Sequence, residues 1–394
     1  MTAETAPSAA PAETTAFEVP SDRKLAVESP HVLALPNGKI LVSFDQTGPD
    51  VKDQSGKKKQ DARRRWMQGR VYASSDEGAT WKLSATYPFR RGTLFRDGGD
   101  IYLAGEASGV LQLMRSPDGG GSWSDPMELS VGHDLLLAPG AVEAVESSWL
   151  LAARVPSGTG LGLQFFRAPR GASLMNRKAW TAGPAGDPMP PEAAWKPDAG
   201  FAVPAGTGKP GWRNPVPLYV PSAVAGEPLV VVPGATSCGR GGWCVWMQTD
   251  PQSLLASPLR TPDGAPWYWQ PWPGGHDTFA VARDPASGLW ALAAQAGAGP
   301  AWPARAAASA PTRRRVGLWV SEDLMEWRPL GTLFVGGEGP DGLRADPALA
   351  FCGNALVAVC RAGSPATRND RDARRILCRR IPDFRRLAAG GARL

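Results

Sequence analysis

The chain has 394 residues and a formal net charge of +6; 43% of its residues are hydrophobic and 20% are charged. Its 46 Gly and 39 Pro interrupt regular helices, which excludes helical bundles and coiled coils. The 16 Trp outnumber the 11 Phe and 5 Tyr. No segment approaches the about 20 consecutive apolar residues that cross a bilayer, so we expect no membrane span.

Residues 1–22 are rich in Ala, Pro, Thr and Glu and predict a disordered tail before a single propeller-sized domain at residues 23–390. The tail lacks the basic and apolar regions of a signal peptide, and the sequence assigns neither a compartment nor an oligomeric state. We interpret the basic clusters, such as residues 57–59 and 313–315, as solvated loops and strand faces, with polyanion binding as the alternative. No nucleic-acid partner is expected.

Cysteine and histidine do not predict a metal site. The five Cys have no CxxC spacing and the chain holds only three His, so we expect no structural zinc. Cys238 and Cys244 bracket a Gly-rich loop, where either a disulfide or a pair of reduced thiols is possible.

The first segment with strand character covers residues 39–44 and is strongly apolar. Asp45 follows it directly and leads into a loop that contains Gly and Pro. A carboxylate in this place can point into a central cleft, so Asp45 is the first candidate for a catalytic acid or base, with an Asx-turn cap as the alternative. Glu106 follows a second strand-like run, residues 101–105, and is a candidate for a second catalytic carboxylate.

Two segments, residues 74–81 and 116–123, share the pattern Ser-x-Asp-x-Gly-x-Ser/Thr-Trp. The pattern fits a hairpin turn, because the Ser and Asp side chains accept backbone N–H bonds, the Gly adopts a positive φ and the Trp packs beneath the turn. We therefore expect Asp76 and Asp118 to be structural. Asp323, in a shorter copy of the same turn, is expected to be structural as well.

Weaker copies of this turn follow at residues 173–180 and 321–327, and a last turn lies at residues 382–385. Short apolar runs bounded by Gly, such as residues 229–232 and 279–282, lie between the turns. Repeated units of this kind predict four-stranded blades in a radial arrangement. The turns favour an all-β fold, a six-bladed β-propeller, with seven blades as the alternative because the region after the third turn is poorly punctuated.

His276 and Asp277 follow two Gly in a loop that enters a strand-like run. A neutral His in such a place can hydrogen-bond a ligand hydroxyl or serve as an acid or base, and both residues are candidates for substrate binding. A loop His that is bonded to the backbone is the alternative.

The turn repeats and several longer stretches resemble the sialidase superfamily, whose blades carry the Asp-box or BNR repeat. From about residue 25 onward the chain is most similar to bacterial sialidase-like exo-glycosidases. The matching stretches are residues 29–49, 90–123, 273–292, 316–327 and 345–363. The resemblance implies a six-bladed propeller that hydrolyses a terminal sugar from a glycan, with no metal and no organic cofactor.

The resemblance also implies site residues. Asp346 fits the Asp of the group's Asp-Trp pattern, although Pro347 replaces the Trp, which makes Asp346 a candidate catalytic carboxylate. Arg361 ends a strand-like run as the group's Ser-Arg-Thr pattern does, which implies a cation directed at the substrate. Asp372 falls on the Asp of the group's His-Asp-Ala-Asn pattern and is a further candidate for substrate binding.

Further positions also depart from the family's pattern. Typical sialidases have a Phe-Arg-Ile-Pro motif whose Arg clamps the carboxylate of sialic acid, and the aligned residue here is Glu28, which would repel a carboxylate. Phe44 and Arg371 replace histidines of the sialidase-like group, and Arg374 replaces the Asn of its His-Asp-Ala-Asn pattern. Sialidases use a Tyr nucleophile, and none of the five Tyr lies in the expected late-blade context.

We therefore expect an exo-glycoside hydrolase that acts on a glycan or oligosaccharide through paired carboxylates, and the sequence does not favour sialic acid as its substrate. One alternative is a carbohydrate-binding propeller without catalysis. The other is a propeller lyase or rhamnosidase that uses His276 as a base on an acidic polysaccharide.

Overall fold

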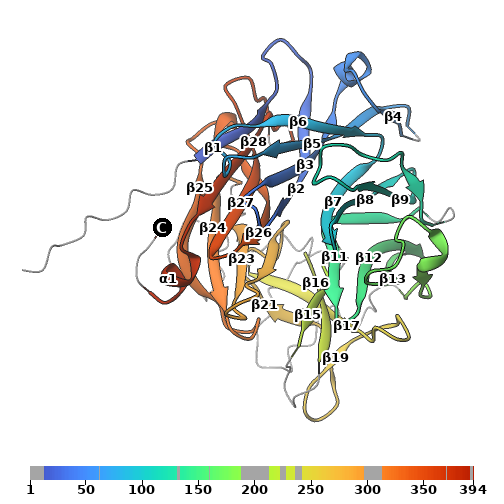
Figure 1. The fold of residues 1–394 in the computed structure, drawn as a ribbon. Coiled ribbons are helices and arrows are strands. Elements are labelled where there is room, and N and C mark those ends of the chain that lie inside the picture. Colours follow the sequence, from blue (N-terminus) through green and yellow to red (C-terminus); the bar gives the residue numbers. More distant parts are fainter. Residues whose placement is uncertain are drawn as a thin grey trace, which may run out of the picture.

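The structure is a computed structural model that describes residues 13–61, 63–130, 134–158, 160–187, 213–221, 228–235, 242–296, 313–369, 371–390 and 394. These residues form mostly β-strands, which are arranged as six blades around a central axis (Figure 1). The prediction of a six-bladed β-propeller is confirmed, and the seven-bladed alternative is wrong. Within the described ranges, no helix has the length and apolar character needed to cross a membrane.

The first three blades follow the chain from its N-terminal side. Blade 1 contains β2 (Ala26–Ala34), β3 (Ile40–Thr47), β5 (Trp66–Ser74) and β6 (Lys82–Tyr87), with β4 (Lys59–Gln60) also paired to β5. Blade 2 contains β7 (Arg90–Asp97), β8 (Asp100–Ala107), β9 (Val110–Ser116) and β10 (Met127–Glu128). Blade 3 contains β11 (Leu136–Val145), β12 (Ser148–Ser157), β13 (Gly160–Pro169) and β14 (Thr181–Ala182).

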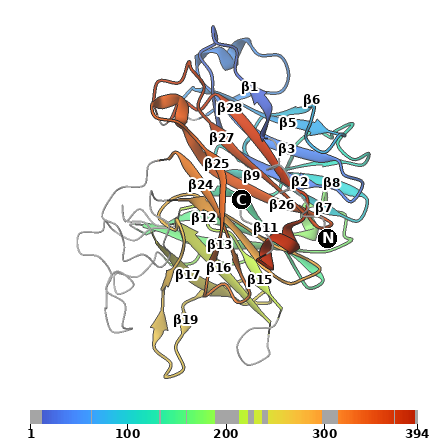
Figure 2. The ribbon, with the colours of Figure 1, turned by 90° about the vertical axis from the view of Figure 1, so that its left-hand side faces the viewer.

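The other three blades complete the ring. Blade 4 contains β15 (Leu218–Val220), β16 (Leu229–Ala235), β17 (Trp243–Thr249) and β18 (Ala256–Ser257), with β21 (Trp269–Pro271) also paired to β17. Blade 5 contains β22 (Ala280–Arg283), β23 (Trp290–Gln295), β24 (Arg315–Ser321) and β25 (Arg328–Val335). Blade 6 contains β26 (Arg344–Cys352), β27 (Ala355–Ala362), β28 (Arg375–Ile381) and β1 (Glu13–Glu18). A separate hairpin of β19 (Leu259–Arg260) and β20 (Pro266–Trp267) projects from the ring (Figure 2).

The hydrophobic core is divided among the blade interfaces. Each of six clusters of buried apolar side chains joins two neighbouring blades. Phe44 of blade 1 and Val357 of blade 6, for example, belong to one cluster. Cys244 is buried in the cluster between blades 4 and 5, whereas Cys238 lies outside the described residues, so both alternatives for this pair stay open. Alternating apolar residues thus face both neighbours, as stacked sheets require.

The repeated turns hold their shape through side-chain hydrogen bonds. In the first turn the Gly78 N–H donates to Ser74 Oγ at 2.8 Å, and the Thr80 N–H donates to Asp76 Oδ1 at 2.8 Å. Hydrogen bonds from Thr80 and Ser74 lower the pKa of Asp76 to about 2. Asp118 and Asp323 accept backbone N–H groups of their own turns in the same way. All three carboxylates therefore have the structural surroundings expected for turn residues.

The N-terminal residues correct one expectation. We expected residues 1–22 to form a tail, yet residues 13–18 form β1, which pairs antiparallel with β28 as the outer strand of blade 6. The Val19 N–H continues this contact by donating to the carbonyl oxygen of Arg374 at 2.8 Å. Ala16 and Val19 are buried between blades 6 and 1. Residues 1–12 lie outside the described part of the chain.

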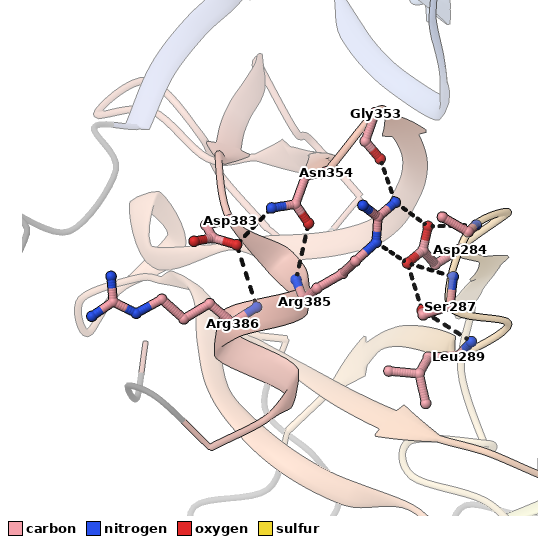
Figure 3. A network of polar contacts seen from close by, with 9 residues as sticks. Asp284, Ser287, Leu289, Gly353, Asn354, Asp383, Arg385 and Arg386 are labelled. Atoms are coloured by element: carbon pink, nitrogen blue, oxygen red, sulfur yellow. Dashed lines mark hydrogen bonds and ion pairs between the residues drawn. The ribbon is translucent and has the colours of Figure 1, made fainter.

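A short helix, α1 (Phe384–Ala388), ties blade 6 to blade 5 (Figure 3). The Arg385 guanidinium donates to both carboxylate oxygens of Asp284, at 2.7 and 3.0 Å, and Asp284 is fully buried in the turn between β22 and β23. Ser287 Oγ donates to the same carboxylate at 2.5 Å. The hydrogen bond from Arg385 is the main reason that the pKa of Asp284 lies well below its ordinary value.

We expect Arg385→Met to lower the free energy of unfolding, because it leaves a buried carboxylate without its cation. Urea denaturation measures this loss. The difference should fade at acidic pH, where Asp284 takes up a proton and no longer attracts the guanidinium. Arg386→Met is the matched control, since Arg386 is exposed and shares only a backbone N–H with this network. Equal stability of the two variants would contradict the role of the ion pair.

Candidate functional site

The innermost strands β2, β7, β11, β15, β22 and β26 surround a cavity of about 910 Å³ on the propeller axis. Cavities of about 300–1,000 Å³ commonly bind small molecules. Its charged lining residues come from all six blades: Glu28, Arg91, Glu143, Arg154, Arg213, Arg283, Arg313, Asp346, Arg361 and Arg371. Among the described residues, seven arginines thus face three carboxylates, which gives the cavity an excess of positive charge.

Four of the six innermost strands share a backbone feature near their start. In β2, β7 and β26 the pairing with the next strand shifts its register at this point, and such a bulge re-aims a side chain. The residue there has a positive φ in four blades: Ser29 (53°), Arg91 (56°), Asn214 (47°) and Asp346 (48°). All four line the cavity, and Pro or Gly follows each. Because a positive φ costs a non-glycine residue about 1 kcal/mol or more, this ring indicates a functional constraint.

Asp346 is the carboxylate around which blades 4, 5 and 6 meet. Arg361 Nε donates to Asp346 Oδ2, and Thr278 forms a further side-chain hydrogen bond with this carboxylate. Asn214 Nδ2 donates to Thr278 Oγ1 at 2.8 Å and so extends the network into blade 4. Burial acts to raise the pKa of Asp346, but the charges of Arg361 and Arg313 and these hydrogen bonds hold it below its ordinary value. Asp346 is therefore ionised at neutral pH.

Arg91 of blade 2 and Arg213 of blade 4 lie close enough to Arg154 of blade 3 to affect its ionisation. Burial and the charges of Arg91 and Arg213 together lower the pKa of Arg154 to about 10, while the charge of Glu106 acts in the opposite direction. Like charges gathered in a half-buried cavity attract an anion, because a bound anion relieves their repulsion. This side of the cavity is therefore suited to a carboxylate or a similar group.

Glu106, predicted as a catalytic carboxylate, lies behind this arginine cluster. Its side chain is 5% exposed at the end of β8, and it is not among the residues that line the cavity. Burial raises its pKa, against the opposing charges of Arg91 and Arg90. Glu143 does line the cavity, on β11, and burial raises its pKa to about 7. Glu143 lies near the turn between β11 and β12, whereas Arg154 of β12 pairs with Leu136 at the start of β11, so the two side chains lie at different ends of this strand pair.

Asp45 also lies behind the cavity wall, at the end of β3. It is 2% exposed, and its two carboxylate oxygens accept the Arg91 N–H at 3.1 and 2.9 Å. Burial raises its pKa to about 7, although the hydrogen bond from the Arg91 N–H lowers it. Asp45 is not among the residues that line the cavity. Its contact with the cavity is indirect, through Arg91, which does line it.

Asp277 and His276 support the wall of blade 5. The Arg313 guanidinium donates to both oxygens of Asp277, at 2.8 and 3.2 Å, and this pair fixes Arg313 at the cavity. His276 is 9% exposed and does not line the cavity. Neither of its ring nitrogens has a hydrogen-bond partner among the described residues. Burial lowers its pKa, so the ring is neutral at pH 7.

Of the remaining residues singled out in the sequence, Arg361 and Glu28 line the cavity and Asp372 does not. Arg361 lines the cavity and binds Asp346, so the structure brings together two residues that the sequence singled out. Asp372 instead accepts the Arg368 N–H at 3.2 Å within a turn of blade 6 and does not line the cavity. Glu28 lines the cavity at the position where the family's pattern has an Arg.

Sequence reasoning missed the arginine cluster. Arg91 directly precedes Gly92, and Arg213 lies two residues before Pro215. Arg154 lies near the end of β12. The available signal was a polar residue before Pro or Gly near the start of four of the innermost strands. That signal becomes visible only when the strands have been assigned to their places within the blades.

No protein-family model matches the chain, and no curated protein matches its sequence. Solved structures match it in fold. A protein of unknown function from Dyadobacter fermentans is 14% identical with a TM-score of 0.59, and the match covers 93% of this chain and 97% of that one. The α-L-arabinofuranosidase Arb93A of Fusarium graminearum, solved with an iminosugar inhibitor, is 13% identical with a TM-score of 0.53, over 94% of this chain and 97% of that one.

A sialidase of Trypanosoma rangeli, solved with sialic acid, is 12% identical with a TM-score of 0.55. That match covers 95% of this chain and 59% of the sialidase. At such identities the likeness establishes the fold, and the chain is a sialidase-like six-bladed propeller.

We expect Arg213→Met to raise the free energy of unfolding at low ionic strength by about 0.5–1 kcal/mol, because it removes a charge that repels Arg154. This gain in stability should shrink in 0.5 M salt, where a Debye length of about 4 Å screens the repulsion between the arginines. Urea denaturation at both salt concentrations measures it. Arg177→Met, which changes an exposed arginine of blade 3, should leave stability unchanged. Destabilisation by Arg213→Met would contradict the repulsive cluster.

Proposed function

We propose that this chain is a glycoside hydrolase that removes a terminal sugar carrying an anionic group from a glycan. The observation that carries the proposal is the cavity itself, which is lined both by an ionised Asp346 and by the arginine cluster of blades 2–4. The sialidase and arabinofuranosidase with the same fold are glycosidases, which supports this reaction class.

The chemistry requires two carboxyl groups. One gives a proton to the leaving oxygen while the glycosidic C–O bond breaks, and the other attacks the sugar carbon or takes a proton from the attacking water. Asp346 suits the second role, because Arg361 keeps it ionised and in place. Glu28 suits the first role, since β2 packs against β26 and both residues line the cavity. Asp45 and Glu106, the other candidate carboxylates, lie behind the wall.

The anionic group of the sugar would bind Arg91, Arg154 and Arg213. Guanidinium groups bind carboxylates with paired hydrogen bonds, which orients the sugar as well as attracting it.

A glycan-binding propeller without catalysis is the second candidate function. Two observations favour it: Asp346 is already paired with Arg361, and the lining residues that the structure describes include no tyrosine. In this case the cavity would retain a terminal acidic sugar without cleaving it.

Turnover of aryl glycosides tests the proposal. A panel of glucuronide, sialoside, glucoside and arabinofuranoside should show hydrolysis of an acidic member, and Asp346→Asn should reduce kcat by about 10³-fold. Asp125→Asn is the control, because its carboxylate is 91% exposed and lies far from the cavity lining. Binding of an acidic sugar without turnover of any substrate would support the second candidate function and overturn the hydrolase.

A further inference from the structure

We propose that Asp45 is a positioning residue that holds Arg91 at the cavity wall, so that the bound anionic sugar depends on a carboxylate it never touches. The proposal rests on the function above only for the identity of the ligand. The geometry that carries it lies entirely within the interface of blades 1, 2 and 3.

Asp45 fixes the backbone of Arg91. Both of its carboxylate oxygens accept the same Arg91 N–H, at 3.1 and 2.9 Å, from the end of β3. Arg91 has a φ of 56°, a conformation that destabilises a non-glycine residue. A charged acceptor for its N–H offsets this cost, because hydrogen bonds to ionised groups are stronger than neutral ones. Ser43 Oγ adds a second tie by donating to the Gly92 carbonyl oxygen at 2.5 Å.

The guanidinium of Arg91 is fixed at its other end. Arg91 Nη1 donates to the carbonyl oxygen of Leu137 on β11, at 3.0 Å. Arg91 therefore crosses from blade 2 to blade 3 and lies along the cavity wall, where its charge is close enough to lower the pKa of Arg154. A change of its φ to a common value would turn this side chain away from Leu137 and from the cavity.

The carboxylate of Asp45 is enclosed by groups from three sides. Glu28 of β2 and the Tyr87 hydroxyl, 3.5 Å from Asp45 Oδ1, face it, as do Arg90 and Arg91 of β7. Burial raises the pKa of Asp45 to about 7, with the Arg91 hydrogen bond opposing. Protonation below that pH weakens the acceptor, so the hold on Arg91 should loosen in mildly acidic solution.

Crystal structures of two variants test the proposal without any ligand. In Asp45→Ala, which has no acceptor, Arg91 should leave its positive φ and lose the hydrogen bond to Leu137. In Asp45→Asn, whose amide oxygen still accepts one N–H, Arg91 should stay in place. An unchanged Arg91 in Asp45→Ala would overturn the proposal. If Asp45→Ala does not fold, Asp45→Leu, which fills the same space without an acceptor, takes its place. A displaced Arg91 in Asp45→Leu supports the proposal, and an unmoved Arg91 overturns it.

A double-mutant cycle measures the consequence for binding, with methyl β-D-glucuronide as the probe in calorimetry. Asp45→Ala should weaken binding about ten-fold in the wild-type background and have no further effect in Arg91→Ala, because the two residues act as one unit. The loss of affinity for the glucuronide on passing from pH 8 to pH 6 should be larger in the wild type than in Asp45→Asn, because Asp45 takes up a proton in this range and an Asn at this position does not. Asp100→Ala, which removes the carboxylate of an ion pair on β8, is the control and should leave affinity unchanged.

Two outcomes would contradict the coupling. An equal loss from Asp45→Ala in both backgrounds would show that Asp45 does not act through Arg91. No binding of the glucuronide by the wild type would overturn the anionic substrate, and the position of Arg91 in the variant crystals would still decide the role of Asp45.

Discussion

The pairing of β1 with β28 is the constraint on which the propeller depends. Blade 6 takes its outer strand from the N-terminal side of the chain, so the ring closes only when two distant segments meet. Closure covers the exposed edge of β28 and completes the sixth blade interface. It also places β2 beside β26, which brings Glu28 and Asp346 into one cavity.

The cavity carries much of the strain in the fold. Positive φ angles at four lining residues, buried carboxylates and a group of like charges all destabilise the folded state. Stability comes instead from the six apolar clusters and from ties such as Asp284 with Arg385, which lie away from the axis. Strain concentrated at one site and offset elsewhere is typical of a ligand-binding centre.

The turn repeats were sufficient to predict the blades, because each repeat is local and its Ser, Asp, Gly and Trp act within one hairpin. β1 escaped prediction because its short sequence of Glu, Thr, Ala and Phe acquires a strand partner only from the far end of the chain. Asp346 and Arg361 were identified through a family pattern. The sequence could not show that Asp45 lies outside the cavity lining, because that depends on Arg91 lying between Asp45 and the cavity. The arginine cluster combines three blades, and no local pattern contains that information.

The central claim is that the cavity selects an anionic sugar. Calorimetry of the wild-type protein with methyl β-D-glucuronide and methyl β-D-glucoside tests it most directly, because the two probes differ only in a carboxylate that replaces a hydroxymethyl group. The account predicts that the glucuronide binds at least about ten-fold more tightly, a difference of about 1.4 kcal/mol that falls with added salt. Equal affinity for both probes, or a preference for the glucoside, would contradict it.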